Sequence, residues 1–415
     1  MKKVLVVGGG AAGMMAAAVA AECGAQVFLL EKQSRVGLKL GITGKGRCNL
    51  TSAEEDRSRF IAGYARNGPF LFSALNAFSN LDLIRFFQEH GLACKVERGE
   101  RVFPQSDKAL DVVRVLYENL ARLGVEVKKS QGVKALLFQG GKIIGVQTPR
   151  GQIVADAVII ATGGMSYSRT GSTGDGYKWA AAAGHHIVQP RPGLVPLVVE
   201  ESWVGELQGL SLKNVRATAW TSKGKKVNED FGEMLFTHFG VSGPIILSMS
   251  RDIGEELLRQ EKVRLVLDLK PAMNEEKLDQ RLQRDLALYS RRQFRNSLDD
   301  LLPRKLIPLM VRLSGIDPQK ESNQVSRQER KKLLQLLKKF ALTVVATRPI
   351  DEAIVTAGGV DVKEVDPRTM QSKLVKALFF AGEILDIDGY TGGFNLQAAF
   401  STGYLAGKSA ALLYR

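Results

Sequence analysis

Apolar residues near the start of the chain form two short runs separated by a glycine-rich turn. The first run, 4–7, leads directly into GGGAAG at 8–13, and the second run, 26–30, ends at the acid Glu31. This order predicts a β-strand, a glycine turn, a helix and a second, parallel strand. The opening residues therefore predict a dinucleotide-binding unit.

The glycines of this turn have separate expected roles. Gly8 permits the tight turn, Gly10 lets a pyrophosphate approach the backbone, and Gly13 lets the helix pack close to the sheet. Glu31 follows Gly8 by 23 residues, where a carboxylate accepts hydrogen bonds from adenosine ribose hydroxyls and disfavours a 2′-phosphate. The alternative is a glycine-rich turn that binds no ligand.

Further periodic segments predict the core of the same domain. Helices are expected at 70–92 and 108–123, a strand at 125–127, a strand pair at 132–144 and a buried strand at 154–161. The last strand ends in Thr-Gly-Gly, so its carboxyl end is open, which is where ligands bind on an open α/β sheet. The glycine-led helix at 171–184 follows a loop and not a strand, so we do not predict a separate NAD site there.

Composition changes near Pro192, where prolines and a glycine cluster. Beyond it the chain is expected to be strand-rich to about Leu269, and then helical and basic at 275–313 and 326–340. The tail should return to the first sheet as strands at 353–359 and 378–382 and a helix within 389–411. The predicted organisation is a first part of the nucleotide domain at 1–192, an insert at 193–347 and a second part at 348–415.

The overall composition fits a cytoplasmic globular protein. A chain of 415 residues exceeds one core, so two domains are expected. No apolar run approaches the ~20 residues of a membrane span, and no signal-peptide pattern precedes Val4. Cys23, Cys48 and Cys94 form no C-x-x-C pair and no metal-ligand cluster, so we expect reduced thiols and no metal site.

The net charge of +15 is unevenly distributed. From Lys277 to Lys339 there are 16 Lys and Arg and seven Asp and Glu, a net charge of +9, although starting at Glu275 lowers it to +7. Such a concentration is typical of a surface that binds a polyanion. The alternative is the solvated helical surface of a basic protein.

Four glycine-bearing strand ends along nearly the whole chain indicate a ligand longer than NAD, and FAD fits this arrangement. Glu31 would hold the adenosine ribose, Glu383 the ribityl or phosphate region, and the helix starting near Phe394 would point its N-terminus at the flavin. The loop at 37–46 has four glycines with interleaved cations and should contact the cofactor, unless it is a flexible linker. The predicted cofactor-binding residues are Gly8, Gly10, Ala11, Ala12, Gly13, Glu31, Lys32, Lys39, Gly44, Gly46, Arg47, Cys48, Asn49, Val133, Ala161, Thr162, Gly163, Gly382, Glu383, Gly393, Phe394, Asn395 and Leu396.

Motifs that span the chain resemble the HI0933-like (YhiN/BaiN-like) family of bacterial FAD-dependent oxidoreductases. TGKGRCN and the GYTGGFN tail are the most specific of them, and Thr43 and Lys45 depart from the SGGGRCN that is usual in the family. Lys45 makes this loop more cationic. The motifs are GGGAAG at 8–13, TGKGRCN at 43–49, RVFPQSDKA at 101–109, ATGGMSY at 161–167, GSTGDGY at 171–177, LFTHFGVSGP at 235–244, VTAGGV at 355–360 and FAGEILDIDGYTGGFN at 380–395.

The resemblance implies a glutathione-reductase-type, Rossmann-like FAD domain of the α/β class, interrupted by an inserted β-barrel and helical domain. It also implies NADH or NADPH as electron donor. Members are assigned to double-bond reduction in bile-acid intermediates, and relatives to dihydrouridine formation in large-subunit ribosomal RNA. Both reactions add hydride to a C=C conjugated to a carbonyl, and we predict that flavin N5 delivers it.

A protein acid must protonate the neighbouring carbon. Cys48 is one candidate, and its neighbour Arg47 should lower the pKa of the thiol, which favours a nucleophile more than an acid. His238 is the other candidate, although a hydrogen-bonded core histidine between Phe236 and Phe239 is the simpler interpretation. Arg47 could instead stabilise reduced flavin or bind a phosphate.

Other functions are weighed on the same residues. Disulfide reduction fits poorly because 46 residues separate Cys48 from Cys94, whereas a flavin hydroxylase would use the same FAD site. The basic insert and Lys45 favour an RNA-modifying reductase. A lid-like insert would favour a small-molecule enone reductase, and a flavoprotein that binds RNA without catalysis is a third possibility.

Overall fold

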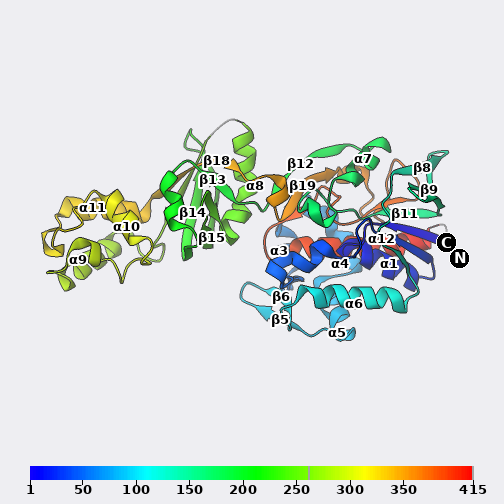
Figure 1. Cartoon of the computed structure of the whole chain (residues 1–415), viewed down its shortest axis with the longest axis horizontal. Helices are drawn as coiled ribbons and strands as arrows, with labels where there is room; N and C mark the ends of the chain where they lie inside the picture. The colour runs from blue at the N-terminus through cyan, green and yellow to red at the C-terminus, as the bar shows by residue number, and fades with distance from the viewer. Residues whose placement is uncertain (260–261, 414–415) are drawn as a thin grey trace. The chain divides into compact units, whose positions relative to one another are not determined.

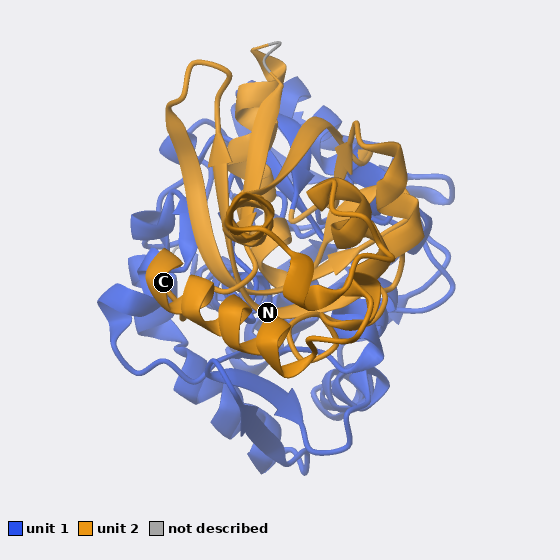
Figure 2. Ribbon diagram, turned by 90° about the vertical axis from the view of Figure 1, so that its left-hand side faces the viewer, with its two compact units in different colours: residues 1–193, 350–415 blue, residues 194–349 orange. Residues whose placement is uncertain are grey.

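The computed structural model describes residues 1–259 and 262–413, which belong to two compact units (Figure 2). The first unit contains residues 1–193 and 350–415, and the second contains residues 194–349. The first unit is thus built from both ends of the chain, with the second unit inserted between them.

A five-stranded parallel sheet forms the centre of the first unit, in the order β20-β11-β1-β2-β7. Residues 4–7 and 157–160 are buried, as expected for central parallel strands that read as continuous apolar runs. The tail completes the sheet, since Val158 of β11 is in register with Leu378 of β20. The strands are β1 (Lys3–Val7), β2 (Gln26–Leu30), β7 (Glu126–Lys128), β11 (Ala157–Ile160) and β20 (Leu378–Phe380).

Helices α1 (Ala11–Glu22) and α12 (Phe394–Leu412) pack side by side, one from each end of the chain (Figure 1). A Cβ on Gly403 would meet the carbonyl oxygen of Ala12 at 2.4 Å, and one on Gly407 would meet that of Ala16 at 2.3 Å. Glycine at these two positions therefore lets the helix backbones touch. The remaining α-helices of this unit are α2 (Leu38–Ile42), α3 (Arg57–Ala62), α4 (Phe72–Ala77), α5 (Asn80–Glu89), α6 (Ala109–Arg122) and α7 (Asp175–Ala182).

The structure corrects several predicted elements of the first unit. The helix expected at 70–92 is broken into α4 and α5, because Phe78 is extended and Ser79 starts α5 with a capping box. The strand expected at 154–161 begins only at Ala157, since Val154 is exposed and ends β10. Small antiparallel sheets contain β3 (Thr51–Ser52), β4 (Tyr64–Arg66), β5 (Cys94–Glu97), β6 (Arg101–Pro104), β8 (Ala135–Gln139), β9 (Lys142–Thr148), β10 (Gly151–Val154), β12 (Ile187–Gly193), β19 (Val355–Val360) and β21 (Asp388–Gly389).

The first tail strand does not rejoin the parallel sheet. β19 pairs antiparallel with β12, and only β20 adds to the central sheet.

Among the described residues, the helices lack the combination of length and apolar composition needed to span a membrane.

The second unit contains a closed six-stranded barrel, in the order β13-β16-β15-β14-β17-β18. Helices α9 to α11 lie beside the barrel (Figure 1). The fold class expected from the sequence, an interrupted Rossmann-like unit with a β-barrel and helical insert, is confirmed. The elements are β13 (Leu197–Val199), β14 (Ser211–Trp220), β15 (Lys226–Phe236), β16 (Gly240–Ser242), β17 (Val263–Asp268), β18 (Phe340–Thr347), α8 (Pro244–Leu258), α9 (Glu275–Leu288), α10 (Ile307–Ser314) and α11 (Arg327–Lys338).

Two elements of the insert were missed. The segment expected to be strand-rich contains helix α8, which buries Ile246, Met249 and Ile253 at helical spacing. The helix expected at 326–340 ends at Lys338, and β18 follows it with alternating buried residues. β18 pairs with both β13 and β17 and so closes the barrel.

Candidate functional site

The first glycine turn combines tight packing with one open position. A Cβ on Gly8 would meet the Ala161 carbonyl oxygen at 2.4 Å, and one on Gly13 would meet that of Gly8 at 1.8 Å. A Cβ on Gly10, by contrast, would have no described atom within 4 Å. Gly10 is the N-cap of α1 and makes no side-chain capping bond, and no acid lies in the first turn. Backbone N–H groups at this end of α1 are therefore available to an anion.

Glu31 and Lys32 lie beside this turn and order its surroundings. The carboxylate of Glu31 accepts hydrogen bonds from the N–H groups of Gly9 and Gln33, both at 2.8 Å. Lys32 Nζ donates to Thr173 Oγ1 at 2.5 Å and to Asp175 at 2.7 Å, which ties the GSTGDGY loop to the end of β2. Each Glu31 oxygen keeps a lone pair for a further donor such as a hydroxyl.

The segment that contains Val133 reaches the same place. Gln131 N–H donates to the Glu31 carbonyl at 2.9 Å, and a Cβ on Gly132 would lie 3.5 Å from Lys32 Cβ. The structure thus brings three separately predicted residues, Glu31, Lys32 and Val133, to one edge of the sheet.

The end of β11 meets the first turn and the tail. Ala161 packs against Gly8 and Gly13, and the Thr162 hydroxyl is buried with no hydrogen-bond partner in the described part of the chain. Gly163 has a left-handed φ of 72°, and a Cβ there would lie 3.9 Å from the Glu383 carboxylate. The small residues after β11 therefore lie over the carboxyl end of the sheet, as the sequence indicated.

The half-buried carboxylate of Glu383 links its own segment to three others through hydrogen bonds. It accepts hydrogen bonds from Lys39 Nζ at 2.6 Å, from Thr356 N–H at 2.7 Å and from Ser166 Oγ at 3.2 Å. Lys39 Nζ also donates to Ser166 Oγ at 2.7 Å. Gly382, which precedes Glu383, lies so close to α1 that a Cβ added to it would lie 2.7 Å from Ala12 Cβ. Ser166 and Thr356 were not predicted, because only the tertiary structure shows that they meet Glu383.

The loop at 43–49 is attached to the start of α12. With its amide oriented so that both atoms are satisfied, Asn49 accepts a hydrogen bond from Gly393 N–H at 3.0 Å and donates to the carbonyls of Thr51 and Val102. Asn395 donates to the Gly389 carbonyl at 2.8 Å and accepts from the Gly389 N–H at 2.8 Å. Gly393 has φ 98°, and a Cβ there would meet the Thr51 backbone at 2.4 Å, so only glycine fits between loop and helix.

Phe394 begins α12 among aromatic rings. Its ring lies 5.1 Å from Phe60 and 5.8 Å from Tyr64 between centroids, and the Tyr64 hydroxyl donates to its carbonyl at 2.9 Å. Complete burial raises the pKa of Tyr64, so this hydroxyl stays protonated as a donor. Leu396 packs against the same core. The first turn of α12 is thereby held firmly next to the 43–49 loop.

Arg47 is already engaged by carboxylates. It contacts Glu97 and Asp107, with 2.5 and 2.6 Å to its Nη2, and its guanidinium lies 4.2 Å from the Phe103 ring centroid. Hydrogen bonds from Arg47 lower the pKa of Glu97, and those from Lys95 and Arg47 lower the pKa of Asp107. The expectation that Arg47 binds a phosphate or reduced flavin is not favoured, because two acids satisfy this cation.

The lowered pKa expected for Cys48 is wrong. The Cys48 side chain is buried, and burial raises the pKa of its thiol to about 12, which outweighs the lowering effect of its contact with Thr43. Arg47 points into its carboxylate pair and not toward the sulfur. Cys48 is therefore a protonated thiol shielded from solvent.

Cys94 lies near enough to Cys48 to raise its pKa electrostatically. Sequence separation is thus a wrong reason to exclude a disulfide reductase. Burial, however, raises the pKa of Cys94 to about 11, so both thiols are protonated and poor nucleophiles near neutral pH. Both cysteines are free in this structure.

His238 is exposed in the segment between β15 and β16, with its ring 4.9 Å from that of Phe239. The interpretation as a core histidine is therefore wrong. It belongs to the second unit, whereas every other predicted site residue belongs to the first. The acids Glu97 and Asp107 were missed, although the RVFPQSDKA motif that ends near Asp107 was a usable signal.

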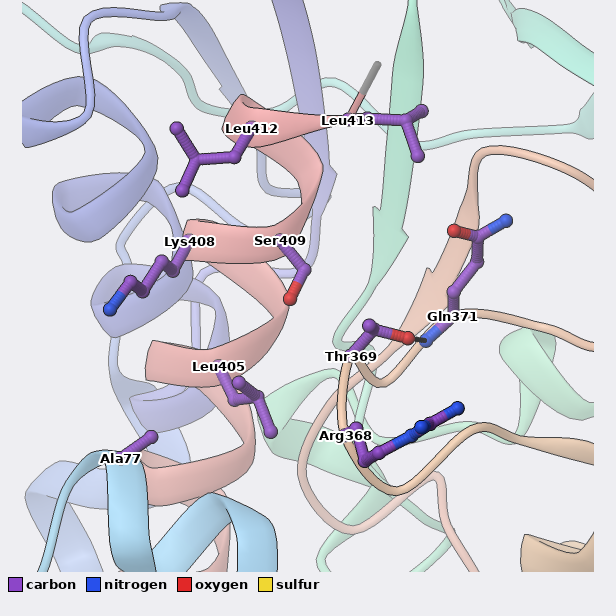
Figure 3. Close-up of a pocket in the computed structure, with 9 residues that line it drawn as sticks. All are labelled: Ala77, Arg368, Thr369, Gln371, Leu405, Lys408, Ser409, Leu412 and Leu413. Atoms are coloured by element: carbon purple, nitrogen blue, oxygen red, sulfur yellow. Dashed lines mark hydrogen bonds between the residues drawn. The ribbon is translucent and has the colours of Figure 1, made fainter. Parts of the chain in front are cut away.

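A separate surface pocket of about 380 Å³ lies along the C-terminal half of α12 (Figure 3). It starts at Leu405, eleven residues or roughly 16 Å beyond the first residue of the helix. None of its lining residues is a predicted cofactor residue, so it does not coincide with the glycine-turn site. The lining comprises Ala77, Arg368, Thr369, Gln371, Leu405, Lys408, Ser409, Leu412 and Leu413.

The chain is similar in sequence to a known protein family and to proteins of assigned function. A family model described as HI0933-like protein Rossmann domain matches residues 2–409. A 3-dehydro-bile acid delta(4,6)-reductase of Clostridium scindens is 34% identical, over 99% of each chain. Ribosomal RNA dihydrouridine synthases of Haemophilus influenzae and Escherichia coli are 30% and 29% identical, each over 96% of both chains.

A solved structure shares the fold at low identity. The 3-ketosteroid-delta4-(5alpha)-dehydrogenase of Rhodococcus jostii covers 99% of this chain and 97% of its own, with a TM-score of 0.55 and 15% identity. At this identity the likeness concerns the fold alone.

Proposed function

Since the chain belongs to the HI0933-like family, we propose that it is an FAD-dependent oxidoreductase that reduces a C=C conjugated to a carbonyl. In this proposal FAD is held by the first unit, where both chain ends meet. The three free cysteines suit a reducing compartment, so we place the reaction in the cytoplasm.

The residues of the first unit fit FAD. Gly10 leaves open space at the start of α1, where the backbone would hold the pyrophosphate, and Glu31 would accept from the adenosine ribose. The first turn of α12 and the 43–49 loop would hold the flavin. FAD would supply the hydride for the reduction, with NADH or NADPH as the source of electrons.

The chain itself must position the substrate and supply a proton. Of the two candidate acids, the Cys48 thiol is buried, whereas the His238 ring is exposed. We therefore assign the proton donor to His238, and treat Arg47 as a positioning residue that fixes the loop through Glu97 and Asp107.

We propose uridine in large-subunit ribosomal RNA as the substrate, and one observation carries this choice. Ten of the 16 cations between Lys277 and Lys339 are exposed and make no ion pair with any described residue. Exposed cations without acidic partners can bind the phosphates of a polyanion, whereas cations neutralised by neighbouring carboxylates would bind them weakly. The ten are Lys277, Arg291, Arg292, Arg295, Arg304, Lys305, Arg327, Lys331, Lys332 and Lys339.

Gene deletion followed by mass spectrometry of ribosomal RNA tests this substrate. We expect dihydrouridine to disappear from one position and to return on complementation. An unchanged dihydrouridine level would reject the RNA substrate.

Binding measurements test the surface itself. The variant Lys331→Gln/Lys332→Gln should bind RNA more weakly, with a shallower salt dependence. Lys108→Gln/Arg150→Gln removes two exposed charges from the first unit and should bind like wild type. If six phosphates are contacted, wild-type affinity should fall about 10³-fold between 50 and 200 mM salt; salt-independent binding would contradict the surface.

A small-molecule enone is the second candidate, favoured by the 34% identity to the bile-acid reductase. Purified protein given NADH or NADPH and a 3-oxo-Δ4,6 bile acid would then show saturable loss of the conjugated chromophore. No turnover by protein that retains FAD would reject this candidate. Rapid reoxidation by oxygen coupled to substrate hydroxylation would instead indicate a hydroxylase.

A further inference from the structure

Lys45 stands out in the loop at 43–49 because its charge has no ion-pair partner among the residues that the structure describes. Other cations of this region are paired with acids: Lys39 with Glu383, Arg47 with Glu97 and Asp107, and Lys95 with Asp107. The Lys45 side chain is exposed and makes no ion pair or side-chain hydrogen bond within residues 1–259 and 262–413.

The backbone at this position would favour glycine. Lys45 has φ 58° and ψ 39°, a left-handed conformation that crowds any Cβ. Its neighbours Gly44 and Gly46 also have positive φ and are glycines. Lysine thus occupies a position where the backbone alone would be better served by glycine, which points to a role for its side chain.

The loop that presents Lys45 is fixed at both ends. Thr43 Oγ1 donates to the Leu40 carbonyl at 2.7 Å, and Cys48 N–H donates to the Thr43 carbonyl at 3.0 Å. Asn49 is bonded to Gly393 at the start of α12. Since four residues span at most roughly 14 Å, Lys45 lies near the proposed flavin site.

We propose that Lys45 binds an anionic group of the substrate, and so contributes to substrate choice. The inference rests on the proposed flavin site. The anion would be a backbone phosphate next to the target uridine or, for the second candidate substrate, the carboxylate of a small enone. An ammonium on a rigid loop can contact either group with charge-assisted hydrogen bonds.

Substitution of Lys45 separates this role from cofactor binding. Lys45→Gly should raise KM for a large-subunit rRNA fragment about 10-fold with kcat within about 2-fold, while FAD affinity and the apoprotein melting temperature do not fall. Lys45→Arg should keep KM near wild type. Glu100→Gly is the matched control, because Glu100 is another exposed residue with a left-handed φ, of 57°.

Two substrates distinguish the source of the anion. A selective KM increase for the RNA fragment identifies phosphate, and an increase for the 3-oxo-Δ4,6 bile acid but not for its methyl ester identifies carboxylate. Unchanged KM for both, or a loss of FAD affinity in Lys45→Gly, overturns the inference. If wild type turns over neither substrate, the proposed function fails separately. The role of Lys45 is then tested by binding alone, and equal affinity of wild type and Lys45→Gly for both the RNA fragment and the bile acid overturns it.

Discussion

Gly10 and Gly13 lie three residues apart, yet the structure gives opposite expectations for adding a methyl group to each. Gly10 has φ −83° and ψ −168°, which alanine adopts easily, and its Cβ would point into space that is free of described atoms. The Cβ of Gly13→Ala would lie 1.8 Å from the Gly8 carbonyl oxygen, so backbone must move. Gly10→Ala should therefore affect a ligand, and Gly13→Ala the fold.

The magnitudes follow from these contacts. At the N-cap, replacing glycine by alanine costs a few tenths to about 1 kcal/mol, whereas the reduced freedom of the unfolded chain returns about 0.4–1 kcal/mol. The net change in the free energy of unfolding for Gly10→Ala is thus about zero. Overpacking in Gly13→Ala should cost about 1–3 kcal/mol or more. Losing one hydrogen bond to a charged pyrophosphate, worth about 1.5–3 kcal/mol, weakens FAD binding by at least about 10-fold.

Two assays on apoprotein separate these effects. FAD titration followed by flavin fluorescence should show weaker binding by Gly10→Ala, and thermal unfolding should show an unchanged melting temperature. Gly13→Ala should unfold at a temperature lower by about 2 °C per kcal/mol, since the shift becomes smaller as the unfolding unit becomes larger. Wild-type FAD affinity in Gly10→Ala would refute the placement of the pyrophosphate, and a melting temperature lowered as far as in Gly13→Ala would refute the reasoning from open space.

Three other predictions concern titratable groups. Burial lowers the pKa of His185, whose Nδ1 lies 3.1 Å from Glu364 and whose Nε2 lies 2.8 Å from Ser372 Oγ. As pH falls below about 6.5, the unfolded chain therefore takes up a proton at His185 before the folded chain does, so the contribution of neutral His185 to the free energy of unfolding is complete above that pH and declines by up to ~1.4 kcal/mol per pH unit below it. Urea unfolding at pH 7.5 and 5.5 should show that the free energy of unfolding depends less on pH in His185→Asn than in wild type. The same pH dependence in both proteins would contradict this prediction. Since the pKa of Cys48 is raised to about 12, mass spectrometry after iodoacetamide treatment at pH 7.5 should find Cys48 unmodified until the protein unfolds, and rapid native labelling would disprove its burial. His238→Asn should lower kcat about 10²–10⁴-fold with FAD affinity unchanged, while the exposed control His186→Asn retains activity; equal kcat in both variants would remove His238 as proton donor.

The sequence was sufficient where a single local rule dictates the outcome. Strand, glycine turn, helix and acid between Val4 and Glu31 are fixed by spacing, because a tight turn and a close helix each require glycine at a particular position. The same holds for the tail, where Gly393 precedes α12. Both elements lie as expected on the carboxyl side of the parallel sheet.

Local patterns were insufficient wherever a side chain's partner is distant in sequence. Glu383 meets Lys39 across 344 positions, and no periodicity indicates that pairing. Burial likewise reversed the expected pKa of Cys48, because the desolvation of a thiol depends on the segments packed around it. β18 was missed from the sequence, and its closure of the barrel depends on β13, which lies some 140 residues earlier. Sequence thus determined the backbone of the nucleotide turn, whereas packing between remote segments decided which charges are paired and which groups remain available to a ligand.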